Sequence, residues 1–312
     1  MNEPISLQVR PGPAIEWHDF AADSPRFSIA LDGYVRGGPR FEPLGPRANF
    51  NHHEDVDRLA TRSTCAQVLM AIRQGLFGTF RDQDGARATV WVNDPDEDVC
   101  VAWALLHNHH LAVGAMNPML NRLVAMEDAL DCTAGAYPFP PDLPALRELA
   151  WVFEPYRQFR LSGQVPKADA RAYRTVIVDV EARVMAHVTG RGDAIPLDTR
   201  YERIGGGAGW VMVREIGAQA RTGMFSDGVR AFVAVSAAAD GRHEYKIGRL
   251  SPFVPLDLGW LCAELNAREA VGSNLWGGSD IIIGSPRVVG SRLSPDDVAR
   301  TVNEAFEVAR SR

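Results

Sequence analysis

The first half of the chain alternates between short apolar runs and longer segments with helical apolar spacing. Strands are predicted at 26–31 and at 88–92, an uninterrupted β-rich run, and 48–50 precedes a histidine pair as a strand end would. Helices are predicted at 64–74 and from residue 99 to residue 110. Strand, polar turn and helix in repetition are typical of a parallel sheet, whose ligand sites lie at the carboxyl ends of its strands.

The second half has a different pattern. Residues 118–173 are mostly helical, and 175–180 is either a strand or part of a helix that runs on to Val188. Beyond a glycine-rich stretch at 204–209 the pattern predicts three strands followed by two helices, at 210–214, 229–235, 243–249, 256–267 and 295–310. The sequence therefore predicts an α/β protein, with a parallel-sheet N-terminal domain in residues 1–195 and a smaller α+β domain in residues 205–312.

Composition places limits on the function. Hydrophobic residues make up 46% of the 312 residues, which is ordinary for a globular protein with a sizeable core. The formal net charge is −6, so extensive binding of long duplex nucleic acid is disfavoured, whereas a short or mononucleotide ligand is still allowed. Four widely spaced cysteines fit neither a zinc knuckle nor a disulfide framework. Without a signal-peptide pattern or a long apolar run, we expect a cytoplasmic protein that does not enter a membrane; a homodimer is compatible with the sequence.

Carboxylates are concentrated directly after the predicted strand at 88–92. Asp96 and Asp98 are one residue apart at a strand-to-helix turn, where both can face a pocket and ligate one or two metal ions. The macrodipole of the following helix would explain one or two acids at its first turn. Four acidic residues occur here, more than that explanation needs: Asp94, Asp96, Glu97 and Asp98.

Two neighbouring histidines form the second polar cluster. His52 and His53 follow the short apolar stretch at 48–50 and precede Glu54 and Asp55. Imidazole and carboxylate together suit Mn, Fe or Zn, although a solvated loop would also explain the pattern.

Single acidic residues follow two other predicted elements. Asp32 ends the strand at 26–31, so its carboxylate is expected at the sheet edge where the other clusters converge. Asp131 follows a predicted helix and is a weaker candidate ligand.

A glycine-rich stretch in the C-terminal part could bind an anion. Backbone amides beside glycine, together with one guanidinium, suit a phosphate group, although an ordinary glycine-rich turn has the same pattern. The candidate residues are Gly277, Gly278, Ser279 and Arg287, with Lys246 and Arg249 from a nearby strand.

Taken together, these motifs resemble the DHH phosphoesterase superfamily. The triplet Asn51-His52-His53 is similar to the Asp-His-His signature, and residues 61–67 are similar to the Ser/Thr-rich helix start that follows it. Residues 92–98 resemble the His-x-x-Pro-Asp-x-Asp strand end, Asp32 matches the lone bridging aspartate, and 276–287 is similar to the glycine-rich loop of the DHH-associated domain.

The chain departs from that family pattern in three ways. Asn51 stands where the signature has aspartate, and Val92 stands where a histidine ligand is expected. The Pro-Asp-x-Asp element follows the histidine pair instead of preceding it, which implies a circularly permuted sheet. His107 or His110 could replace the missing histidine, or the site could hold a single ion.

The resemblance implies a divalent-metal-dependent phosphoesterase that hydrolyses a small phosphate ester or short nucleotide in an interdomain cleft. Its metal ligands would be Asp32, His52, Asp96, Asp98 and, with less support, Asp131. The ion would be Mn²⁺, with Fe²⁺, Mg²⁺ or Zn²⁺ as alternatives, and it would activate the water that attacks phosphorus. His53, Asp98 and Arg287 would act on the phosphate directly.

Two other functions remain open from the sequence. The ligand set does not specify phosphorus, so a metal-dependent hydrolase or lyase acting on another substrate fits equally well. A binding protein that has lost turnover and retains a nucleotide site is the second alternative.

Overall fold

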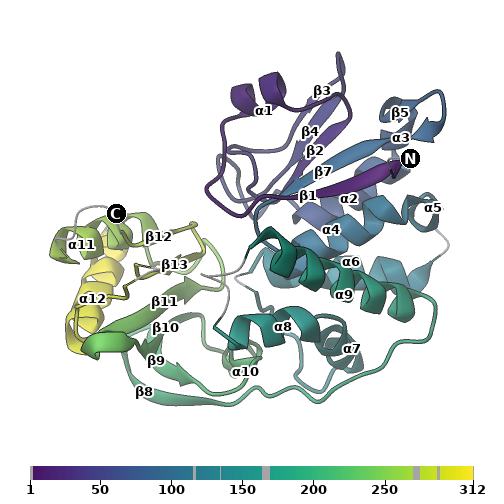
Figure 1. Ribbon diagram of the computed structural model, residues 1–312. Coiled ribbons are helices and arrows are strands. Elements are labelled where there is room, and N and C mark those ends of the chain that lie inside the picture. The colour runs from purple at the N-terminus through teal and green to yellow at the C-terminus, as the bar shows by residue number, and fades with distance from the viewer. Residues whose placement is uncertain are drawn as a thin grey trace. The chain divides into compact units, whose positions relative to one another are not determined.

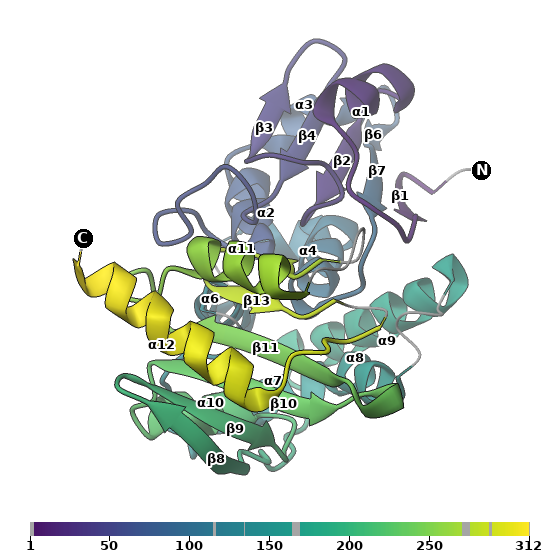
Figure 2. The same cartoon turned by 90° about the vertical axis from the view of Figure 1, so that its left-hand side faces the viewer.

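The structure is a computed structural model that describes residues 3–114, 117–133, 135–163, 169–269, 275–286 and 289–311. Its contacts divide the chain into two compact units (Figures 1 and 2). Unit 1 contains Met1–Cys132 and Pro144–Pro196, and unit 2 contains Thr133–Leu143 and Leu197–Arg312.

Unit 1 is built on a five-stranded sheet with the order β1-β7-β2-β4-β3. The four strands β1, β7, β2 and β4 run parallel, and the short edge strand β3 is antiparallel to β4. Their bounds are β1 Ile5–Val9, β2 Ser28–Leu31, β3 Arg40–Glu42, β4 Arg47–Phe50 and β7 Ala88–Val92, and a separate hairpin is formed by β5 Arg81–Asp82 and β6 Gly85–Ala86. The predicted α/β class with a parallel N-terminal sheet is confirmed.

Helices cover both faces of this sheet (Figure 1). Helix α1 packs on one face, where Phe20 meets Ala30, Tyr34 and Trp91. Helix α4 packs against both α2 and α9, α2 contacts β4, and α4 and α9 contact β1. The helices of unit 1 are α1 Trp17–Asp23, α2 Thr64–Arg73, α3 Leu76–Thr79, α4 Glu97–His107, α5 His109–Ala112, α6 Pro118–Asp131, α7 Pro144–Val152, α8 Glu154–Leu161 and α9 Ala170–Val188.

Unit 2 has a mixed sheet with the order β12-β13-β11-β10-β9-β8, in which only β9 and β10 pair in parallel. Alternation along β10 sends Val233 and Val235 to the face covered by α11 and α12, and Phe232 and Ala234 to the face covered by α10 (Figure 2). The elements are β8 Tyr201–Gly207, β9 Trp210–Glu215, α10 Ala220–Ser226, β10 Ala231–Ala237, η2 Ala239–Gly241, β11 His243–Arg249, α11 Leu258–Glu269, β12 Gly277–Gly278, β13 Ile282–Gly284 and α12 Pro295–Ser311.

The segment 175–180, which the sequence left open between strand and helix, lies within α9. Asp169 caps this helix by accepting hydrogen bonds from the amides of Arg171 and Ala172. The cap lies upstream of the ambiguous apolar run, which explains why the run alone did not decide its structure. Among the described helices, none combines the length and apolarity needed to cross a membrane.

Central strand β2 carries much of the unit 1 core, since all four of its side chains are buried. Ile29 is fully buried, so Ile29→Ala should remove about 2–5 kcal/mol of folding free energy through lost burial and a residual cavity. Urea unfolding followed by circular dichroism measures this change. Leu44→Ala is the control, because Leu44 is 85% exposed and should change stability by less than about 0.5 kcal/mol. Equal effects of both substitutions would contradict the assigned core.

Candidate metal centre

Three neighbouring parallel strands end at the same sheet edge and deliver the polar residues there. Asp32 follows β2, His52 and His53 follow β4, and Asp96 and Asp98 follow β7. Asp32 has a left-handed backbone with φ of 47°, a conformation that typically costs a non-glycine residue roughly 1–3 kcal/mol. Such strain at a strand end is characteristic of functional positions, and aspartate tolerates it better than most residues.

His52 is the centre of the cluster. Its Nε2 lies 2.6 Å from Asp131 Oδ2, 3.4 Å from Asp32 Oδ1 and 3.8 Å from Asp98 Oδ2. The imidazole and the carboxylates of Asp32 and Asp98 are buried, whereas the Asp131 side chain is 23% exposed. One buried nitrogen therefore faces three carboxylates from three different segments of the chain.

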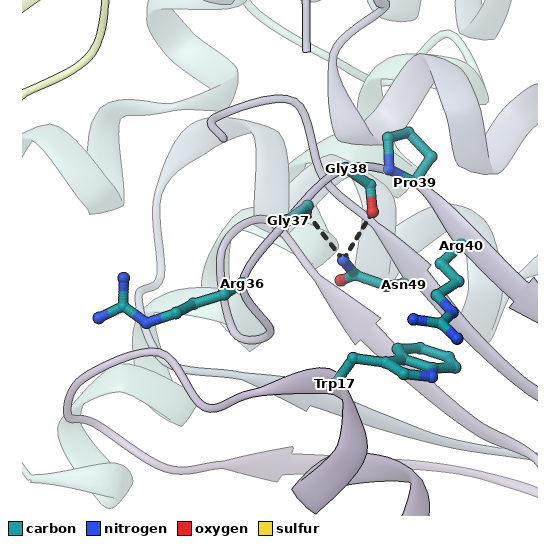
Figure 3. Close-up of a pocket in the computed structure, with 7 residues that line it drawn as sticks. All are labelled: Trp17, Arg36, Gly37, Gly38, Pro39, Arg40 and Asn49. Atoms are coloured by element: carbon teal, nitrogen blue, oxygen red, sulfur yellow. Dashed lines mark hydrogen bonds between the residues drawn. The ribbon is translucent and has the colours of Figure 1, made fainter. Parts of the chain in front are cut away.

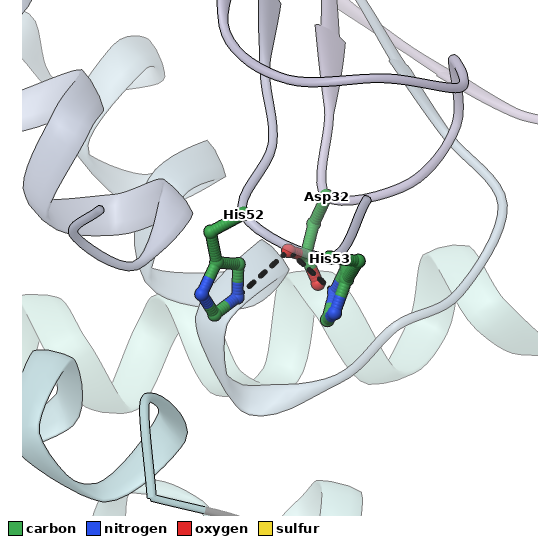
Figure 4. Close-up of side chains that lie close together, drawn as sticks. All are labelled: Asp32, His52 and His53. Carbon is green, nitrogen blue, oxygen red and sulfur yellow. Dashed lines mark ion pairs between the residues drawn. The ribbon is translucent and has the colours of Figure 1, made fainter. Parts of the chain in front are cut away.

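His53 lies on the other side of Asp32 (Figure 4). Its Nε2 is 2.9 Å from Asp32 Oδ1, and its side chain is 34% exposed. The negative charge of Asp32 raises the pKa of His53, although burial opposes the shift. His53 is thus a partly accessible imidazole that Asp32 orients.

The carboxylate of Asp98 is held by the first turn of helix α2. The backbone amides of Thr64 and Cys65 donate to its two oxygens over 2.6 and 2.7 Å. The hydroxyl of Thr64 donates to Asp32 Oδ1 over 2.9 Å, so the same helix start contacts both acids. The positive end of the helix macrodipole favours carboxylates in this position.

Asp96 also has a structural role, because it is the N-cap of helix α4. Its Oδ1 accepts a hydrogen bond of 2.9 Å from the amide of Val99. It is not a member of the two His/Asp groups whose ligand atoms lie close together among the described residues. Those groups are Asp32, His52 and His53, and His52, Asp98 and Asp131.

Crowding of buried carboxylates changes their acidity. Burial, reinforced by the charges of Asp131 and Asp32, raises the pKa of Asp98 to about 7. Burial and the charge of Asp32 likewise raise the pKa of Asp96 well above its usual range. Burial opposes protonation of His52, but the carboxylates of Asp131 and Asp32 outweigh it and raise the pKa of this histidine. Without a bound cation, His52, Asp96 and Asp98 therefore tend to keep their protons, because protonation reduces the repulsion among the carboxylates.

A divalent cation fits this donor set. The ligand atoms are imidazole nitrogen and carboxylate oxygen, which suit Mn, Fe and Zn. Ligand–metal distances of roughly 2.0–2.2 Å place neighbouring ligand atoms roughly 3.0–3.5 Å apart, close to the separations around His52. Although Asp131 Oδ2 is buried and only 2.6 Å from His52 Nε2, it accepts no hydrogen bond from the described residues. These buried groups of aspartate and histidine could hold a divalent ion.

Two buried ionisable residues near the centre, Arg58 and Glu127, were missed from the sequence. Arg58 places Nη2 3.3 Å from His52 Nδ1 and 3.7 Å from Asp131 Oδ2, and its only sequence signal is its position six residues after His52. Glu127 is 2% exposed, and burial raises its pKa well above the usual range. Glu127 precedes Asp131 by one helical turn of α6, a spacing that puts both residues on the same helix face.

The structure accounts for Asn51, the first departure from the Asp-His-His signature. Its Nδ2 donates to the carbonyls of Gly37 and Val35, and its Oδ1 accepts from the amide of His53. An aspartate would present oxygen to those two carbonyls, so asparagine is the residue that this buried position requires.

The second departure from the family pattern is Val92, which stands where a histidine ligand is expected, and His107 was a candidate to replace that histidine. Val92 is fully buried among apolar residues at the end of β7. His107 pairs with Glu181 over 2.6 Å and stacks on Trp103. The His107 imidazole is therefore engaged by Glu181 and Trp103, and its position is explained without a role as a metal ligand.

The predicted phosphate-binding residues of the C-terminal part lie in unit 2. Strand pairing aligns Lys246, Gly284 and Gly277, and both Gly277 and Gly278 are exposed. Lys246 pairs with Glu215 over 3.2 Å, and the guanidinium of Arg249 donates to the carbonyls of Asp280, Val254 and Leu256. The hydroxyl of Ser279 accepts hydrogen bonds from the amides of Ile281 and Ile282. Arg287 lies outside the described residues.

No protein-family model matches the chain, and no curated protein matches its sequence.

Removing the central imidazole should weaken metal binding. Loss of a residue that only orients a ligand typically costs about 10–100-fold in metal affinity, so His52→Ala should weaken Mn²⁺ binding at least tenfold. Equilibrium dialysis with elemental analysis measures the bound metal. His18→Ala is the matched control, because the His18 side chain is 83% exposed and belongs to neither group. Equal binding by both variants would remove His52 from the ligand set.

Metal binding at pH 7 should release protons. The raised pKa values of His52 and Asp98 mean that the cluster carries protons before an ion enters. Ligation requires the deprotonated forms, so we expect at least about one proton to be released per ion. Calorimetric titration in buffers of different ionisation enthalpy gives the number. Release near zero would show that an ion binds elsewhere.

Proposed function

We propose that this protein is a divalent-metal-dependent phosphoesterase acting on a small phosphate ester or short nucleotide. The observation that carries the proposal is the arrangement of Asp32, Asp98 and Asp131 around His52 at the carboxyl edge of a parallel sheet. When bound, a divalent ion lowers the pKa of a water molecule and offsets the charge that builds up on a phosphoryl group.

The protein side chains would bind the ion, contact the phosphate and supply a proton. His52, Asp32, Asp98 and Asp131 would hold the ion, and the amides of Thr64 and Cys65 fix Asp98. His53 would contact the phosphate, because it is partly exposed while its Nε2 is engaged by Asp32. The raised pKa of His53, caused first by the charge of Asp32, suits it to deliver a proton to the leaving oxygen from Nδ1.

Arg58 would supply a second positive charge. Its guanidinium is buried beside His52 and Asp131, so it would add a fixed positive charge next to the ion. Val92 offers no donor and Asp96 caps helix α4, so the residues that would complete a second ion site are engaged otherwise or apolar. We therefore propose a single ion, with Mn²⁺ as the first candidate.

A substrate-binding role for unit 2 remains part of the proposal. Gly277 and Gly278 are exposed and directly precede Ser279, so this segment is open to an anionic ligand. Lys246 and Arg249 already have protein partners, so the contribution of their charge would be smaller than the sequence pattern suggests.

A binding protein without turnover is the second candidate function. It is favoured by Val92, since an apolar residue at this strand end leaves a single-ion site, without the positive charge that a second ion would add in the transition state. Stoichiometric metal binding with tight nucleotide binding and no hydrolysis would identify this alternative. Turnover of carboxylic esters without turnover of phosphate esters would instead identify a hydrolase of another substrate class.

Activity assays with Mn²⁺ test the proposal directly. Asp131→Asn and His52→Ala should each lower kcat/KM at least about a hundredfold on bis-p-nitrophenyl phosphate and on short oligoribonucleotides. The expected cause is loss of a carboxylate or an imidazole that would hold the ion. Asp142→Asn, at an exposed position outside the cluster, should leave the rate unchanged. Full activity in both cluster variants would refute the proposal.

A further inference from the structure

Strand β3 is an open edge of the unit 1 sheet, and Figure 2 shows it at one end of that sheet with β1 at the other. It pairs with β4 on one side only. Beyond that pairing, the backbone groups of residues 40–42 form no hydrogen bond with the described residues. Free N–H and C=O groups on an edge strand are a template for pairing with another strand.

The other sheet edges are less suited to such pairing. At β1, the guanidinium of Arg174 from α9 donates to the carbonyl of Leu7, so part of that edge is already engaged. Strand β8 of unit 2 has a register shift between Arg203 and Gly205 and ends in consecutive glycines, and both features weaken strand pairing. Strand β12 has only two residues. Among the edges that the structure describes, β3 is therefore the best candidate for a regular partner strand.

The sequence from Pro39 to Pro43 is complementary to itself in an antiparallel pair. With Phe41 at the centre, Arg40 of one copy lies opposite Glu42 of the other, and this contact occurs twice. Pro39 then lies opposite Pro43, and neither proline brings an N–H group that would need a partner. The prolines limit the paired segment to three residues and thereby fix its register.

The side chains of β3 are arranged as this register requires. Alternation along the strand puts Arg40 and Glu42 on one face of the sheet and Phe41 on the other. The Arg40 guanidinium lies over Trp17, 4.7 Å from the ring centroid (Figure 3). Neither Arg40 nor Glu42 forms an ion pair with a described residue, and Phe41 is 53% exposed. The strand thus presents one charge of each sign and one apolar side chain.

The loop that enters β3 is held by the neighbouring strand segment. Asn49 of β4 is 1% exposed, and its Nδ2 donates to the carbonyls of Gly37 and Gly38 over 3.2 Å, while its buried Oδ1 accepts no hydrogen bond from the described residues. Asn51 Nδ2 donates to the same Gly37 carbonyl over 2.8 Å. These bonds order the edge before a partner arrives, which lowers the entropic cost of association.

We propose that β3 pairs with the β3 strand of a second copy of this chain and forms a symmetric homodimer. The two sheets would join into one, with a Phe41–Phe41 contact on one face and two Arg40–Glu42 pairs on the other. Because each copy uses the same edge, the contact is closed and yields dimers instead of fibres. Three paired residues bury little surface, so the dimer should be weak and form at micromolar concentrations.

Sedimentation velocity of the full chain tests this contact. Wild type should change from monomer to dimer between about 5 and about 500 µM, the range of a weak interface. Arg40→Glu and Glu42→Arg each place like charges opposite one another twice, so each should weaken dimerisation at least about tenfold. Mixing the two variants restores both pairs of opposite charge and should give a heterodimer with about the affinity of wild type.

Arg81→Glu is the matched control, because Arg81 is exposed on β5 and the substitution changes the net charge by the same amount as Arg40→Glu. It should dimerise like wild type. A wild-type chain that stays monomeric at the highest concentration would overturn the proposal and leave β3 to a different partner or to none. Equal dimerisation of Arg40→Glu and wild type would place the contact elsewhere and overturn it as well, as would two variants that do not associate when mixed. The measurement involves neither metal nor phosphate ester, so its outcome is independent of the proposed function.

Discussion

Repulsion among buried carboxylates is the constraint on which this site depends. Asp32, Asp98 and Asp131 face one imidazole at the edge of a sheet, where water does not screen their charges well. Such an arrangement is unstable without compensating positive charge. The chain supplies Arg58, the amides at the start of helix α2 and, while they are protonated, two histidines. With neutral histidines, as metal ligation requires, the three carboxylates and Arg58 carry a formal charge of −2, which a divalent ion could offset.

The fold makes this arrangement possible through its parallel strands. Because β7, β2 and β4 are neighbours and run in the same direction, their carboxyl ends bring acidic and histidine side chains from three distant segments to one edge. Helices α2 and α4 begin at the same edge, so their free N–H groups are available to Asp98 and Asp96. The sheet positions the carboxylates and the helix starts stabilise them.

The strand ends were predictable from sequence because a local pattern determines them. The run at 88–92 is continuous and β-rich, and the strand occupies those five residues. The convergence of Asp32, His52 and Asp98 followed from the rule that parallel strands share an edge. Arg58, by contrast, could not be assigned, because its place beside His52 depends on the path of an irregular loop. The same holds for Arg249, whose carbonyl partners come from three separate residues, and for Asn49, whose unsatisfied oxygen depends on the packing of β3 and the preceding loop.

The two hydrogen bonds of Asp98 have a consequence for how this chain would change in evolution. A descendant whose centre could no longer hold an ion would still need Asp98, because helix α2 would otherwise begin with unsatisfied amides at Thr64 and Cys65. The Asp131 carboxylate holds no backbone amide, and its ion-pair partners among the described residues, His52 and Arg58, belong to the centre itself. Selection for folding would therefore preserve Asp98, whereas Asp131 would be free to change. A substitution at position 131, and not at position 98, would therefore mark a lineage whose centre no longer holds an ion.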